Sequence, residues 1–128
     1  MKKSIVVEIK DEKVEINFPN NGDIVSIDNL RSELSFGTYS NDREDDGNQI
    51  LGCFTFLYTM VPEFMEKHGM AKFSWGDKSP HETFEYLYVY RTQILPWLND
   101  TYKELDELKA KLDEKLEKVN AAREKAKK

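Results

Sequence analysis

The feature that most constrains this chain is an apolar stretch at residues 48–68, NQILGCFTFLYTMVPEFMEKH. A helix through it has almost no polar face, and such a helix is buried from several sides or contacts a partner. Pro62 and the charges at Glu66 and Lys67 leave it short of the ~20 apolar residues that a membrane span needs. The segment CFTFLYTMV also alternates, so a strand is the alternative. Because no helix breaker interrupts residues 48–61, we predict a central helix with a bend near Pro62.

The rest of the chain is charged, and the charge is unevenly spread. The net charge is −5 over 128 residues, a length that suits one domain. From Asp100 onward there are nine Lys/Arg and eight Asp/Glu, a net of +1, whereas the preceding residues carry ten and sixteen, a net of −6. An acidic body argues against sequence-independent nucleic-acid binding, which needs cations to displace counterions.

The cysteine count and the start of the chain bear on where the protein works. Cys53 is the only cysteine, so an internal disulfide is excluded and a reducing compartment fits. The opening MKKSIVVEIK lacks the apolar core of a signal peptide. We therefore expect a cytoplasmic protein that does not use a membrane.

Two smaller elements are expected before the central helix. Residues 4–18 alternate apolar and polar side chains in two runs joined by KDEK at 10–13, which predicts a β-hairpin with a four-residue turn. A hairpin alone is barely stable, so it must lie on helices or extend a neighbouring subunit's sheet. Ser26 is the predicted N-cap of a short helix at 27–36, with Gly37 just beyond its end.

The clearest helix start in the sequence is SPHE at 79–82. Ser79 suits the N-cap, Pro80 the first helical position and Glu82 the third, which together form a capping box. We expect a helix over 80–95 that Pro96 breaks or kinks. Its predicted core face consists of Phe84, Leu87, Tyr88 and Leu95. Tyr86 and Tyr90 are expected elsewhere on the helix surface.

Residues 100–128 form a second predicted unit, a long charged helix following a body at 1–99. Its apolar residues have 3-4-4-3 spacing, a narrow stripe that resembles a coiled-coil seam interrupted by Lys115. The stripe consists of Leu105, Leu108, Leu112, Leu116 and Val119. It either docks on its own domain or pairs with another copy or another protein, and we favour the intermolecular role because few large apolar residues follow it.

The sequence offers little catalytic or metal chemistry. Asp42, Glu44 and Asp46 before Gly47 look like the start of a calcium loop, but the twelfth position, which needs a bidentate Glu, is Cys53. Nothing in the spacing of His68 and His81 supports a pairing with Cys53, and a thiol among aromatics is usually inert. We expect no catalytic residue, no metal and no cofactor.

The aromatic residues are better candidates for protein binding. Tyr and Trp dominate interface energetics, so rings off the core face either form an amphipathic rim or anchor a partner. The candidate contact residues, besides the stripe, are Phe56, Tyr86, Tyr90, Arg91 and Trp97.

Two stretches, residues 14–39 and 93–105, carry a family resemblance. They include INFPNNGDIVSIDNL, RSELSFGTYS and QILPWLNDTYKEL, and cover well under half of the chain. Their order is similar to small proteins of tailed-bacteriophage structural gene clusters, some of them tail-assembly chaperones or minor virion components. The resemblance implies a non-enzymatic oligomer that binds an aggregation-prone tape-measure protein in the host cytoplasm, or that is incorporated in the virion.

These observations predict an α+β fold, with an N-terminal hairpin on a bundle of about four helices and a long charged C-terminal helix. The predicted function is protein binding during phage assembly, with self-association as an oligomer. The alternative is a small acidic inhibitor that mimics nucleic acid on a host defence protein, for which the run at 42–46 is the support.

Overall fold

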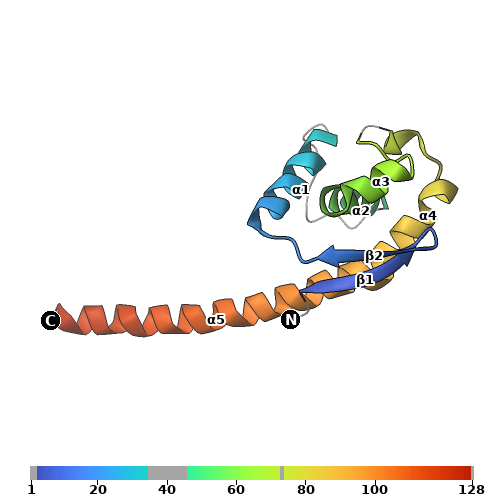
Figure 1. Ribbon diagram of the computed structural model, residues 1–128. Helices are drawn as coiled ribbons and strands as arrows, with labels where there is room; N and C mark the ends of the chain where they lie inside the picture. Colours follow the sequence, from blue (N-terminus) through green and yellow to red (C-terminus); the bar gives the residue numbers. More distant parts are fainter. Residues whose placement is uncertain (1–2, 35–45, 73, 128) are drawn as a thin grey trace.

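A helical body with a β-hairpin on one side and a long projecting helix make up the computed structural model (Figure 1), which describes residues 3–34, 46–72 and 74–127. The predicted fold class is confirmed. The elements in chain order are β1 (Ser4–Ile9), β2 (Glu12–Asn17), α1 (Asn21–Leu34), α2 (Asp46–Met60), α3 (Pro62–Lys67), η1 (Trp75–Asp77), α4 (Pro80–Val89), η2 (Tyr90–Ile94) and α5 (Leu95–Ala126).

The hairpin is confirmed, but its turn is tighter than predicted. β1 and β2 pair antiparallel with Ile9 opposite Glu12, which leaves only Lys10 and Asp11 in the loop. Both have positive φ, 56° and 61°, the left-handed geometry of a two-residue hairpin turn. The Lys10 N–H donates to Oε2 of Glu85 on α4 at 2.8 Å, so a contact distant in sequence helps hold the turn.

The inward side of the hairpin supplies part of the core. Alternate residues of the two strands are buried, whereas Val6 on the other side is exposed. This period-two pattern places one apolar face against the helices, where β1 contacts α4. The buried hairpin residues are Val7, Ile9, Val14 and Ile16.

Helix α1 begins earlier than predicted, at Asn21 rather than after Ser26. The Asp23 N–H donates to Oδ1 of Asn20 at 2.8 Å, and the Asn20 N–H donates to Oδ2 of Asp23 at 3.1 Å. This reciprocal pair closes the helix start as a capping box does. Ser26 therefore lies inside the helix, and the predicted end at Gly37 lies outside the described residues.

The central helix is confirmed as α2 and α3 with a bend between them, and the strand alternative is wrong. Residues 46–60 are helical, and residues 51–57 are seven consecutive buried residues, as in a helix covered from several sides. Pro62 occupies the first turn of α3, where its missing N–H costs nothing. The bend thus falls where the sequence predicted it.

The capping box at Ser79 is confirmed. Of the break or kink predicted at Pro96, the break is wrong, and the helix is irregular just before this residue. The Glu82 N–H donates to the Ser79 hydroxyl, and the Ser79 N–H donates to the Glu82 carboxylate. From there α4 passes through η2, a π-helical segment, directly into α5. Pro96 lies in the first turn of α5, just after η2, and the wider π turn accommodates a ring that would clash in a regular helix.

Candidate protein-binding surface

Beyond Tyr102, helix α5 projects from the body, and we call residues 102–126 the arm. Every residue from 102 to 127 is exposed, and after Tyr102 no other element of the described chain lies beside α5 (Figure 1). The five residues of the predicted stripe are all between 46% and 56% exposed. Because successive helical residues turn by about 100°, the 3-4-4-3 spacing confines them to an arc of about 80°. The arm therefore carries one narrow apolar line into solvent.

The same line is buried where it reaches the body. Leu98 and Thr101, seven and four residues before Leu105, continue the stripe and are 7% and 2% exposed. Phe18, after β2, covers this end by packing edge-on against Trp97, with ring centroids 5.5 Å apart, and against Tyr102 at 6.1 Å. The body thus uses the first two turns of a stripe whose remainder has no cover among the described residues.

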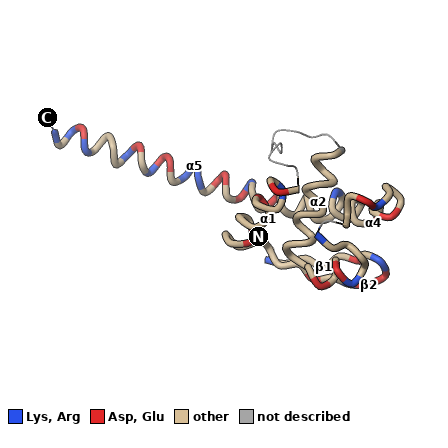
Figure 2. Tube along the Cα trace, turned by 90° about the horizontal axis from the view of Figure 1, so that it is seen from above, with Lys and Arg blue, Asp and Glu red and all other residues tan. Residues whose placement is uncertain are grey.

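The other faces of the arm are charged. Figure 2 shows basic and acidic residues alternating along it. Ion pairs on its surface join residues one helical turn apart, Lys109 with Asp113 at 3.6 Å and Lys118 with Glu114 at 3.8 Å. Such i,i+4 pairs support an isolated helix by a few tenths of a kcal/mol each. The arm is therefore a helix with three solvated sides and one apolar side.

Four of the predicted aromatic contact residues are core residues of the single chain. All four have less than a tenth of their surface exposed, so they have little surface to offer a partner. They are Phe56, Tyr86, Tyr90 and Trp97. Arg91, which lies between them in sequence, is exposed. These four rings therefore hold the body together and do not form a binding surface. Of the predicted contact residues, the stripe is exposed.

The predicted core face of the helix at 80–95 is wrong for two of its four residues, since Leu87 and Leu95 do pack against the core. Phe84 and Tyr88, assigned to the core, are 65% and 57% exposed and stack on each other with centroids 6.1 Å apart. Tyr86 and Val89 are buried instead. Rings occur on both sides of this helix, so periodicity alone could not choose between them. Tertiary packing decides the choice, because β1 and α2 both contact α4 and Tyr86 packs against Phe64 of α3.

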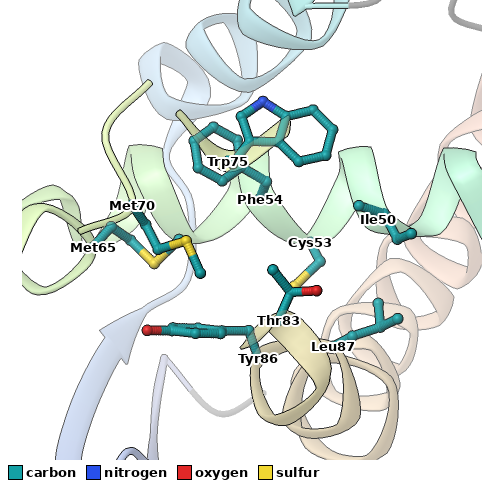
Figure 3. A pocket seen from close by; sticks show the side chains of 9 residues that line it. All are labelled: Ile50, Cys53, Phe54, Met65, Met70, Trp75, Thr83, Tyr86 and Leu87. Carbon is teal, nitrogen blue, oxygen red and sulfur yellow. The ribbon is translucent and has the colours of Figure 1, made fainter. Parts of the chain in front are cut away.

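Besides an open cleft of about 510 Å³ between α1, α2 and α5, the described body holds a small apolar cavity between α2, α3 and α4 (Figure 3). Its volume is about 30 Å³, which is the space of a water molecule rather than a metabolite. Cys53 lines it, and burial raises the pKa of that thiol to about 12, so the thiolate nucleophile is absent at neutral pH. This agrees with an inert packing cysteine.

The two histidines lie apart from this cavity. His68 Nε2 is 3.4 Å from Oε2 of Glu12, which also pairs with Lys67. The hydrogen bond from Lys67, and then that from His68, lower the pKa of the Glu12 carboxyl. His81 is exposed in the first turn of α4. Neither imidazole lines the cavity that holds the Cys53 thiol, so a nucleophile and base pair is not assembled there.

Metal binding finds no support in the part of the chain that is described. No cluster of three His, Cys, Asp or Glu side chains suited to a metal ion occurs among those residues. The suspected calcium loop at 42–46, which is also the acidic run that a nucleic-acid mimic would need, lies outside the described side chains. Within the described ranges, too, no helix has the length and apolarity to cross a bilayer, since the charges of α5 interrupt it.

Comparison with known proteins returns no match to this chain, whether with protein-family models, curated proteins or solved structures. The resemblance to phage assembly proteins therefore stays a prediction from the sequence. What the molecule can do has to be argued from its own surface.

Proposed function

We propose that this protein is a non-enzymatic assembly protein and that the arm of α5 is its binding element for another polypeptide. The observation that carries the proposal is the exposed stripe from Leu105 to Val119. Soluble proteins seldom leave a contiguous row of large apolar side chains in water unless it meets a partner. An isolated helix is also marginal in water, and most helical stability comes from packing an apolar face.

The rest of the molecule suits the same role. The cavity beside the Cys53 thiol is too small for a substrate. The buried aromatic rings hold the start of the arm in place and do not line a reaction site there. Phe84 and Tyr88 offer a second exposed apolar patch on α4, from which a partner held by the arm gains further contact. The acidic body keeps such a molecule soluble before it binds.

The biological setting that we propose is phage particle assembly, and its support is the sequence resemblance together with this binding arm. In that setting the arm binds a tape-measure protein, another structural protein of the particle or a second copy of this chain. The protein acts in the host cytoplasm as a chaperone or remains in the virion as a minor component. The family resemblance supplies the partner's identity, whereas the arm supplies the means of binding.

Co-expression with the products of the neighbouring genes tests the proposal. A tagged chain should retain a structural protein from that cluster, and Leu112→Glu should abolish retention because it places a charge in the middle of the stripe. Ala110→Glu is the matched control, since residue 110 is exposed on the opposite side of the same helix and gains the same charge. If the wild type and Leu112→Glu behave alike in every binding assay, the arm is not a binding element and the proposal fails.

A further inference from the structure

The spacing of the stripe is a palindrome centred on Leu112. Reading 3-4-4-3 from either end gives the same order of apolar positions. If a second helix runs antiparallel with its Leu112 opposite this one, Leu108 faces Leu116 of the second copy and Leu105 faces its Val119. Every large apolar side chain of the stripe then meets another, and the mismatch of Lys115 with a strict heptad does not matter.

The body excludes the parallel arrangement. Leu98 and Thr101 belong to the same face of α5 as the stripe, and the body already covers them. In a parallel pair both bodies would have to occupy the same level of the seam, between the two helices. In the antiparallel pair the two bodies lie at opposite ends, and the apolar residues that overlap are the exposed ones from Leu105 to Val119. Only the last turn of each helix, residues 123–126, reaches the level of the other copy's body.

The charges along the helix favour the same direction. Residues 100–117 carry four basic and seven acidic side chains, whereas residues 118–128 carry five basic and one acidic. A parallel pair aligns acidic with acidic and basic with basic segments. The antiparallel pair places each basic end opposite an acidic segment and beside the other copy's acidic body.

We infer that the occupant of the stripe is a second copy of this chain, bound as an antiparallel helix pair with its two-fold axis at Leu112. This rests on the proposed function and names the partner of the arm. Ten apolar side chains, each about half exposed in the single chain, meet in the pair. With the aliphatic stems of the flanking lysines they bury on the order of 1,000 Å², about what a specific interface needs.

The oligomeric state is the first test. Sedimentation equilibrium of the full chain should give a dimer, and Leu112→Glu should weaken dimerisation at least about 100-fold, because two carboxylates would face each other in an apolar seam. Ala110→Glu should leave the dimer unchanged. A monomer at hundreds of micromolar, or a dimer indifferent to Leu112→Glu, overturns the inference.

Spin-label distances test the direction. Labels are attached to Asp113→Cys or Lys125→Cys in a Cys53→Ala background, or with Cys53 retained if that variant does not fold, because the native thiol is buried. The antiparallel pair predicts a short distance at residue 113 and an axial separation of about 39 Å at residue 125. Short distances at both positions mean a parallel pair and overturn the inference.

These outcomes separate the inference from the proposed function. A monomer that binds a structural protein through Leu112 refutes the second copy as occupant and leaves the assembly role standing. A parallel dimer refutes only the direction. A chain that neither dimerises nor binds a partner through the arm refutes both.

Discussion

The two ends of α5 have the same sequence pattern and opposite environments. Leu98 is 7% exposed and Leu112 is 54% exposed, although both belong to one apolar line on one helix. The difference lies in what faces them, since Phe18, just after the hairpin, covers the first end and no described element covers the second. An apolar stripe therefore indicates that the helix packs against another surface. Whether that surface belongs to the same chain is seen only in the fold.

The largest contrast should come from the same Leu→Ala substitution made in the buried body and on the arm. Leu57→Ala, at a residue with no exposure, should cost about 2–5 kcal/mol of unfolding free energy through lost burial and a cavity. Leu116→Ala, at a 56% exposed residue of the arm, should change it by less than about 0.5 kcal/mol. Urea unfolding of dilute protein measures both. Equal losses would mean that the arm docks on the body.

A second contrast is the response to alkaline pH. Burial raises the pKa of Cys53 to about 12 and is also the main cause that raises the pKa of Tyr86 to about 12. Below the ordinary pKa, 9.0 for the thiol and 10.0 for the phenol, each group is neutral in the folded and in the unfolded chain. Above that pH the group ionises in the unfolded chain but stays neutral in the folded one, which favours unfolding. Stability should thus be constant up to about pH 9 and then fall until about pH 12, by up to about 1.4 kcal/mol per pH unit and group.

Two variants assign this alkaline loss to its groups. Cys53→Ala should flatten the fall that begins near pH 9, and Tyr86→Phe should flatten the part above pH 10. Chemical denaturation at a series of pH values measures the slopes. If neither variant changes the slope, other groups titrate there and the burial of these two does not control the response.

A smaller effect distinguishes the two candidate starts of α1. Asn20→Ala should cost about 1 kcal/mol, because it removes the side chain that accepts the Asp23 N–H. Ser26→Ala should cost nothing or stabilise slightly, because Ser26 is exposed inside the helix and Ala is the better helix former. Thermal unfolding of the two variants checks the order. The reverse order would restore the start that the sequence alone predicts.

The smallest effect concerns the arm by itself. Glu114→Gln removes the charge that pairs with Lys118 and should lower the helical content of the arm by an amount equivalent to a few tenths of a kcal/mol. Glu117→Gln, which has no opposite charge one turn away in the sequence, is the control. Circular dichroism of dilute protein at low and high salt compares them. An identical loss in both variants would show that net charge, not the pair, matters.

Local signals explain what the sequence predicted correctly. The capping box at Ser79, the bend at Pro62 and the alternation of the hairpin strands each depend on neighbouring residues alone. The spacing of the stripe is equally local, so the exposed line on the arm could be found from the sequence. Its exposure could not, because the residues that cover or fail to cover a helix lie elsewhere in the chain.

Contacts between distant segments explain the errors. The turn at Lys10 and Asp11 has no Asn-Gly signal and is held by Glu85, which lies 75 residues away. Packing against β1, α2 and α3 turned Tyr86 inward and left Phe84 and Tyr88 outside, against the predicted face. The continuation past Pro96 depends on η2, since a π-helical turn has no simple residue signature.

The unbroken passage from α4 through η2 into α5 has a mechanical consequence. No loop separates the body from the projecting helix, because the helical backbone continues from one to the other, and Phe18 packs against the start of α5 (Figure 1). At about 1.5 Å per residue, the 25 residues of the arm act as a ruler of roughly 37 Å. In an assembly that joins its units through the arm, this length would set the interval between them.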